Sequence, residues 1–114
     1  MPVVKIRDGD NAVVDLARLQ LYCLDARHPR GVLKARQFEA RLGLGSRDAD
    51  LIRDELLKAV GKSDQAVADR RDEYGQRYEL DVQITGPAGT ATVRSIWIAL
   101  AGASGPRFMT CYVV

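Results

Sequence analysis

Hydrophobic residues recur at three- and four-residue spacing in the first half of the chain, and this period predicts amphipathic helices. A first helix is predicted over residues 15–24, and Pro29 ends helical structure beyond it. A second helix is predicted over residues 32–42, and a third follows an N-cap at Ser46 and ends at Gly61. The apolar faces of the second and third helices are predicted to contain Val32, Ala35, Phe38, Leu42, Ala49, Ile52, Leu56 and Val60.

In the second half of the chain, polar and apolar residues alternate, which is the period of half-exposed antiparallel strands. Turns rich in glycine and proline at residues 86–89 and 102–106 divide this half into strands. The predicted strands, with a short one near the N-terminus, cover residues 3–6, 65–71, 77–84, 90–100 and 107–114. Helices followed by a meander predict the α+β class, with N-terminal helices packed on a C-terminal antiparallel sheet of three to four strands.

The composition agrees with one globular domain over residues 1–114, because 46% of the residues are hydrophobic and 28% are charged. The longest apolar run, residues 96–101, is far shorter than the ~20 residues that span a bilayer. Residues 1–5 lack the features of a signal peptide, so we expect a cytoplasmic protein that does not enter the membrane. Cys23 and Cys111 share no histidine pair, so we expect buried thiols and neither a metal site nor a cofactor.

Basic residues gather around the break between the first two predicted helices, although the net charge of the chain is only +2. The basic members are Arg27, His28, Arg30, Lys34, Arg36 and Arg41, opposed only by Asp25 and Glu39. Such a cluster either attracts phosphate or forms a solvated helix face, and charge patterning favours neither alternative. Arg30 and Arg36 are therefore candidate substrate-binding residues.

Two members of this basic cluster are candidates for catalysis. His28 is the only histidine, and its side chain is the one whose unperturbed pKa lies near neutrality, which suits proton exchange with a substrate. The commoner alternative is an exposed loop histidine without a function. Lys34 lies beside the apolar stripe of its helix, where a cation facing a groove would suit a phosphate or a developing oxyanion. Simple solvation is the commoner position of a helical lysine.

Hydroxyl groups on the last strand form a second candidate feature. A period of two places Phe108, Thr110 and Tyr112 on one face, and Met109, Cys111 and Val113 on the face expected in the core. The Thr110 and Tyr112 side chains would then lie about 7 Å apart along the strand, a spacing that suits adjacent phosphate oxygens. The alternative is that both are ordinary strand residues that face solvent.

Arg77 and Arg94 are candidate phosphate ligands, because a guanidinium group makes bidentate contacts. Tyr74 either stacks on a base or anchors the turn at Gly75, and Trp97 is expected in the core. The chain has no glycine-rich phosphate loop and no evident carboxylate constellation for a divalent ion. Phosphodiester chemistry is therefore expected to be independent of metal, which favours RNA because its 2′-hydroxyl supplies an internal nucleophile.

These motifs resemble an uncharacterised bacterial domain family over nearly the whole chain. The first half matches it in Leu19-x-x-Tyr22-x-Leu24, His28-Pro29-x-Gly31-x-x-Lys34-Ala35-x-x-Phe38 and Leu42-Gly43. The second half matches it in Tyr74-Gly75-x-x-Tyr78, Val93-Arg94-x-x-Trp97 and Pro106-Arg107-x-x-Thr110-x-Tyr112. Helices followed by a sheet that ends in Thr-x-Tyr are similar to the barnase–EndoU–colicin–RelE group of ribonuclease toxins.

This resemblance implies metal-independent cleavage of RNA on the sheet, by a toxin that a small acidic antitoxin partner holds inactive. His28 would transfer protons, Lys34 would neutralise the transition state, and Thr110 and Tyr112 would orient the phosphate, with Arg94 as a weaker addition. EndoU-like enzymes pair two histidines, whereas this chain has one, so the second acid or base stays unassigned. The alternative function is a non-catalytic RNA-binding or protein-interaction module, the partner half of a two-gene system.

Overall fold

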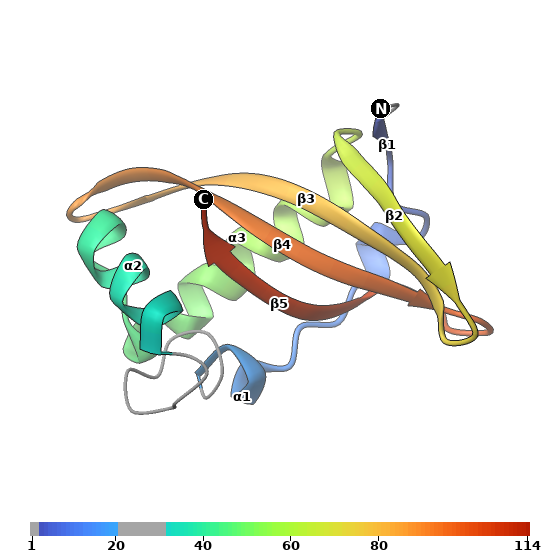
Figure 1. The fold of residues 1–114 in the computed structure, drawn as a ribbon, viewed down its shortest axis with the longest axis horizontal. Coiled ribbons are helices and arrows are strands. Elements are labelled where there is room, and N and C mark those ends of the chain that lie inside the picture. The colour runs from blue at the N-terminus through green and yellow to red at the C-terminus, as the bar shows by residue number, and fades with distance from the viewer. Residues whose placement is uncertain (1–2, 21–31) are drawn as a thin grey trace.

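The computed structural model describes residues 3–20 and 32–114, and these residues form an α+β fold (Figure 1). The helical elements are η1 (Gly9–Asn11), α1 (Leu16–Arg18), α2 (Val32–Leu42), η3 (Ser46–Asp48) and α3 (Ala49–Lys62). The strands are β1 (Val3–Val4), β2 (Ala66–Asp72), β3 (Gly75–Gly86), β4 (Gly89–Leu100) and β5 (Arg107–Val113). The predicted class is confirmed.

The sheet has five strands in the order β1-β2-β3-β4-β5, and every neighbouring pair is antiparallel. The prediction of three to four strands was therefore too low. The additional strand is β1, where Val3 pairs with Val67 and Val4 with Ala66. This pairing brings together segments that are more than 60 residues apart in the chain. The short apolar pattern at residues 3–6 predicts a strand but does not indicate which strand it pairs with.

The β3–β4 hairpin sets the register of the sheet. Its pairing continues without a shift from Gly86 opposite Gly89 at the turn to Gly75 opposite Leu100 at the far end. Gly89 has φ 148°, a conformation that favours glycine, so the turn depends on this residue. Because directly opposite residues share a face, one face of the hairpin is apolar and the other is polar.

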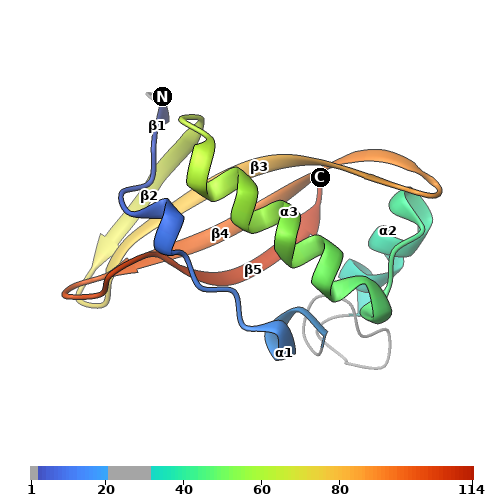
Figure 2. The ribbon, with the colours of Figure 1, turned by 180° about the vertical axis from the view of Figure 1, so that it is seen from behind.

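We call the second face of the sheet the polar face. From β3, β4 and β5 it contains Arg77, Glu79, Asp81, Gln83, Thr92, Arg94, Thr110 and Tyr112. The opposite, apolar face is covered by α3, which crosses it as seen from behind in Figure 2. The predicted apolar stripe of α3 is confirmed, because Ala49, Ile52, Leu56 and Val60 are buried in the core.

The start of α3 differs in detail from the prediction. The chain enters α3 through the short turn η3, and Gly45, the residue before this turn, occupies the N-cap position that the sequence predicted for Ser46. The Gly45 N–H donates to Asp48 Oδ2 at 2.9 Å. Gly61 lies inside the helix, which continues to Lys62.

The C-terminal end of α2 rests on the β3–β4 turn. The Ala88 N–H donates to the Leu42 carbonyl oxygen at 3.1 Å, and Gly43, with φ 71°, turns the chain away from the helix. A Cβ atom at Gly86 would collide with the Leu42 carbonyl oxygen, so the close approach of helix and turn requires glycine there. This contact fixes the position of α2 beside β4 and β5.

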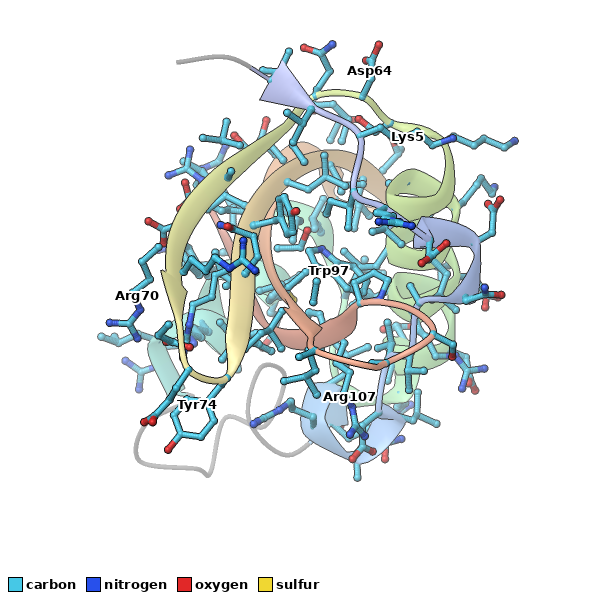
Figure 3. All side chains as sticks on the ribbon, turned by 90° about the vertical axis from the view of Figure 1, so that its right-hand side faces the viewer. Lys5, Asp64, Arg70, Tyr74, Trp97 and Arg107 are labelled. Atoms are coloured by element: carbon cyan, nitrogen blue, oxygen red, sulfur yellow. The ribbon has the colours of Figure 1, made fainter. Side chains whose placement is uncertain are left out.

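Trp97 lies in the core, as predicted, between the sheet and the helices (Figure 3). Its indole Nε1–H donates to Ser95 Oγ at 2.8 Å, and the Ser95 hydroxyl donates to the Leu80 carbonyl oxygen at 2.6 Å. The Trp97 ring meets the Phe108 ring edge to face, with centroids 5.6 Å apart. The polar groups of this buried cluster are thus paired with one another.

The prediction that Phe108 shares a face with Thr110 was wrong. Trp97 lies opposite Phe108 and Ile96 lies opposite Thr110, so Met109 is an extra residue that forms a bulge in β5. The bulge moves Phe108 to the apolar face, where it is buried, while Thr110 and Tyr112 remain on the polar face.

The predicted first helix is confirmed only at its start. In α1, the Asp15 side chain accepts a hydrogen bond from the Ala17 N–H at 3.0 Å and caps the helix. Residues 21–24 of the predicted span lie outside the described residues, as does Cys23, whereas Cys111 is buried in the core. Over residues 3–20 and 32–114, no helix is long and apolar enough to cross a membrane.

Candidate functional site

Lys34, Thr110 and Tyr112 come together where α2 approaches β5, and we call them the Lys34 cluster. The Lys34 ammonium group donates to Thr110 Oγ1 at 2.9 Å, in a partly buried position. The same nitrogen lies 5.8 Å from the centre of the Tyr112 ring, which is within the range of a cation–π contact. Of the four residues predicted to be catalytic, Lys34 therefore contacts two others, Thr110 and Tyr112.

Two local features of the chain produce this convergence. Lys34 lies in the first turn of α2, one residue before the buried Ala35, so its side chain leaves the core at the edge of the helix. Thr110 and Tyr112 follow the bulge at Met109, and both lie on the polar face of β5. The bulge therefore places the two hydroxyl groups on the face that Lys34 reaches.

A cross-strand row extends from the Lys34 cluster across the polar face. Tyr112 lies opposite Arg94, and Arg94 lies opposite Asp81. The Arg94 guanidinium donates to both carboxylate oxygens of Asp81, at 2.9 and 3.1 Å. Asp81 raises the pKa of Arg94 above its ordinary value, and Glu79 and the Tyr112 hydroxyl act in the same direction. Arg94 is therefore a fixed cation whose charge is compensated by Asp81.

Lys34 and Arg94 thus differ in electrostatic state. Asp81 compensates Arg94, whereas within the described part of the chain no carboxylate lies within salt-bridge distance of Lys34. The hydroxyl of Thr110 is neutral, so it positions the ammonium group without cancelling its charge. An anion that approached the polar face near β5 would meet the uncompensated charge at Lys34.

Arg77 shares the polar face but lies away from the Lys34 cluster. It is paired with Ile98, four residues or about 13 Å along β4 from Arg94. Its Nε lies 3.6 Å from Asp72 Oδ2, and its Nη1 donates to Met109 Sδ at 3.6 Å. The side chain is half-buried and is held by these contacts in the part of the sheet near the β2–β3 turn.

The remaining predicted residues do not join the Lys34 cluster. Tyr74 is exposed at the β2–β3 turn and points away from the core, as Figure 3 shows. Arg36 is exposed and lies two residues after Lys34 on α2, so the two side chains do not share a face of the helix. His28 and Arg30 lie outside the described residues.

The sequence comparisons place the chain in a family. Residues 5–114 match the model of a domain of unknown function, DUF6883. The chain belongs to the DUF6883 family. No curated protein and no solved structure matches it. None of these comparisons links the DUF6883 domain to the barnase–EndoU–colicin–RelE group, so that resemblance stays a prediction. The evidence for what the site does is therefore its geometry.

Asp81 is the charged residue of this site that sequence reasoning missed. Counting outward from the 86–89 turn along both strands places Asp81 opposite Arg94. That register was available from the sequence, because a tight turn fixes the pairing of both its strands.

A pocket of about 440 Å³ beside the Lys34 cluster was also not predicted. Its lining residues are Leu33, Lys34, Gln37, Tyr112 and Val113. They come from α2 and from the end of β5, and no pattern within either segment indicates that the two are neighbours.

The arrangement is suited to holding an anionic oxygen. A positioned ammonium group, a threonine hydroxyl and a tyrosine hydroxyl can surround a phosphate or stabilise charge that develops on it. Among the described residues, no three His, Cys, Asp or Glu side chains are grouped so that they could share a metal ion.

Proposed function

We propose that the protein is a metal-independent endoribonuclease that cleaves RNA at the Lys34 cluster and leaves a 2′,3′-cyclic phosphate. The observation that carries this proposal is the 2.9 Å contact between the Lys34 ammonium group and Thr110 Oγ1, with the Tyr112 ring 5.8 Å away. These groups surround a position for a phosphate, and no described carboxylate cancels the charge of Lys34.

In the proposed reaction, the 2′-hydroxyl of a nucleotide attacks the neighbouring phosphorus, and the bond to the 5′-oxygen breaks. Lys34 compensates the negative charge that grows on the non-bridging oxygens, and its contact with Thr110 keeps it in position before the substrate arrives. Tyr112 orients the phosphate from the adjacent position on β5. One of the two proton transfers, from the 2′-hydroxyl or to the leaving 5′-oxygen, is assigned to His28 from the sequence alone, and the group that makes the other stays unassigned.

Arg94, Arg77 and Tyr74 fit the role of substrate contacts rather than of catalysts. Arg94 has five N–H donors, and the pair with Asp81 uses only two of them, so donors remain for a phosphate. Arg77 lies farther along the same face, and Tyr74 lies at its end, so an extended strand of RNA could follow the sheet. Arg30 and Arg36 are further candidate contacts from the basic cluster.

The proposal includes the biological context that the resemblance implies. The enzyme would act as a toxin on RNA in the cytoplasm, and a small acidic antitoxin would hold it inactive. Acidic side chains of such a partner would be attracted to the same uncompensated charge that attracts phosphate.

Purified protein incubated with total bacterial RNA in EDTA tests the proposal. We expect cleavage that persists in EDTA and yields 2′,3′-cyclic phosphate and 5′-hydroxyl ends. Intact RNA at high protein excess would reject free-standing nuclease activity. Binding of RNA without cleavage would instead support the alternative, a non-catalytic RNA-binding module, for which affinity losses are spread over several Arg and Lys positions.

A further inference from the structure

The pocket beside the Lys34 cluster has a mixed lining that suits one class of ligand. On α2, Gln37 lies four residues after Leu33 and three after Lys34, so its side chain neighbours both of theirs, and these residues line the pocket together with Tyr112 and Val113 of β5. Its volume of about 440 Å³ lies within the ~300–1,000 Å³ range of small-molecule sites. One end of the pocket is therefore cationic, and its walls are aliphatic and aromatic.

Leu33 is the least expected member of this patch. It is 71% exposed in the first turn of an amphipathic helix, on the side next to Lys34 rather than in the core. A single exposed leucine has no meaning by itself, but Leu33 lines the same pocket as an aromatic ring, that of Tyr112, and a second aliphatic side chain, that of Val113. A flat apolar group could contact Leu33, Tyr112 and Val113 together, and it would remove all of them from water.

Gln37 adds the polar contact that a flat apolar ligand of biological origin would require. Its side-chain amide offers two N–H donors and one carbonyl acceptor, and this amide makes no hydrogen bond to another described residue. A nucleobase combines a stacking surface with donors and acceptors at its edge, and its phosphate lies a few bonds away. The site has the matching arrangement, because the pocket offers an apolar surface and the Gln37 amide for a base, and the adjoining Lys34 cluster offers donors for a phosphate.

We infer that this pocket is a nucleobase subsite, in which Leu33 and Tyr112 hold a base while Lys34 and Thr110 hold the adjoining phosphate. The inference rests on the proposed function and specifies it, because it assigns the base next to the reacting phosphate to defined side chains. It makes Leu33 and Gln37 specificity-determining residues that take no part in the cleavage step.

Methyl NMR of the protein, titrated with the four nucleoside 3′-monophosphates and with inorganic phosphate, tests the subsite. We expect the nucleotides to shift the methyl signals of Leu33 and Val113 and to bind about tenfold more tightly than phosphate, given the usual contribution of a stacked base. Leu33→Ala should remove most of this advantage and leave the affinity for phosphate unchanged. Leu51→Ala, which changes a partly exposed leucine of α3 away from the pocket, is the matched control and should change neither affinity.

Two results would overturn the subsite. One is equal affinity for nucleotides and phosphate, and the other is tighter nucleotide binding without a change at the Leu33 and Val113 methyl groups. Neither result concerns cleavage, so this titration and the RNA assay in EDTA test separate claims. A nuclease that lacks the subsite would cleave RNA but fail the titration, and a base-binding protein without activity would do the reverse.

Discussion

At the scale of single residues, the site depends on how each charge is held. Arg94 and Lys34 are both basic residues at the polar face, but Asp81 binds one through two hydrogen bonds and Thr110 binds the other through a neutral hydroxyl. The distinction matters because only an uncompensated cation gives a strong attraction for phosphate. Lys34 is therefore the residue suited to compensating negative charge on a phosphate, and Arg94 is suited to positioning the substrate through hydrogen bonds.

Thr110 gives the first prediction at this scale. Thr110→Val keeps the shape of the side chain and removes the oxygen that accepts from Lys34, so the ammonium group loses its fixed position. We expect the rate of RNA cleavage to fall about tenfold or more, the usual effect of losing a hydrogen bond to a charged group. Single-turnover cleavage in EDTA measures it. Thr85→Val, on the exposed side of β3, is the control, and equal rates for both variants would contradict the role of Thr110.

Asp72 gives the second prediction, which concerns pH. The Tyr74 N–H donates to Asp72 Oδ1 at 2.9 Å and lowers the pKa of this carboxyl below its ordinary value of 3.8, and Arg77 and Arg70 act in the same direction. A carboxyl whose pKa is lowered on folding stabilises the fold above its unfolded pKa, and the contribution is lost as the pH falls through the folded pKa.

Urea denaturation of the wild type and of Asp72→Asn, measured at several pH values, tests this linkage. Asparagine keeps a hydrogen-bond acceptor for the turn and loses the charge. We expect the wild type to be the more stable protein above about pH 4, and the difference to shrink as the pH is lowered further. A difference in unfolding free energy that did not vary with pH would contradict the assignment.

The sequence predicted the three residues of the Lys34 cluster but not the bulge beside them or the partner of Arg94. Lys34, Thr110 and Tyr112 were chosen from helix and strand periodicity, and the structure brings them together. Phe108 was assigned to the wrong face because a bulge at Met109 leaves no signal in an alternating pattern. Asp81 was not predicted as part of the site, although the 86–89 turn fixes its register opposite Arg94.

At the scale of elements, the position of α2 determines whether the site exists. The helix is fixed at one end by the β3–β4 turn, through the Ala88 hydrogen bond to Leu42 and the close approach of Gly86. Lys34 lies at the other end of the same helix. A displacement of the turn would therefore be transmitted along α2 to the ammonium group, because an α-helix moves as a rigid element.

Gly86→Ala tests this connection. The added Cβ collides with the Leu42 carbonyl oxygen, so α2 must move or the turn must open, at a cost of about 1–3 kcal/mol in unfolding free energy. We also expect cleavage to fall about tenfold or more, although the substitution is far from the Lys34 cluster in the chain. Urea denaturation and the RNA assay measure the two effects.

The control for this experiment lies in the same hairpin. Thr90→Ala removes the exposed contact between the Thr85 and Thr90 hydroxyls, 2.8 Å apart, and does not alter the approach of the turn to α2. Cleavage that fell equally in both variants would indicate a general effect of weakening the hairpin, and the proposed connection would be rejected.

Among the elements, those with strong periodicity were predicted well. The apolar stripe of α2 at Ala35, Phe38 and Leu42, the stripe of α3 and the alternation of β3 matched the structure, because burial on one face dictates each pattern. The first helix starts where its pattern predicts, with Asp15 as its N-cap, and Val13 just before it forms an isolated bridge with Arg107 of β5. This long-range bridge has no signal in the local pattern of the sequence.

At the scale of the whole molecule, the two faces of the sheet have different roles. One face packs against α3 and forms the core around Trp97, and the other presents polar residues that end at the Lys34 cluster. The site lies between two segments 76 residues apart in the chain, Lys34 in α2 and Thr110 in β5. Sequence periodicity can predict which face each residue occupies, but the meeting of these segments is a property of the tertiary fold.

The central claim is that the Lys34 cluster cleaves RNA without a metal, and one comparison tests it most directly. Single-turnover cleavage of a short RNA and of the DNA with the same sequence is measured in EDTA with three proteins: the wild type, Lys34→Ala and Lys58→Ala. Lys58 is an exposed lysine of α3 that contacts Glu55 at 3.8 Å, so its variant controls for the loss of one positive charge.

We predict that the wild type and Lys58→Ala cleave the RNA at similar rates and leave the DNA intact, because only RNA supplies the 2′-hydroxyl nucleophile. Lys34→Ala should keep its fold by urea denaturation and cleave about 100-fold more slowly, as expected for the loss of a positioned group that stabilises transition-state charge. Cleavage by Lys34→Ala at the rate of the wild type would contradict the claim, as would cleavage of RNA and DNA alike.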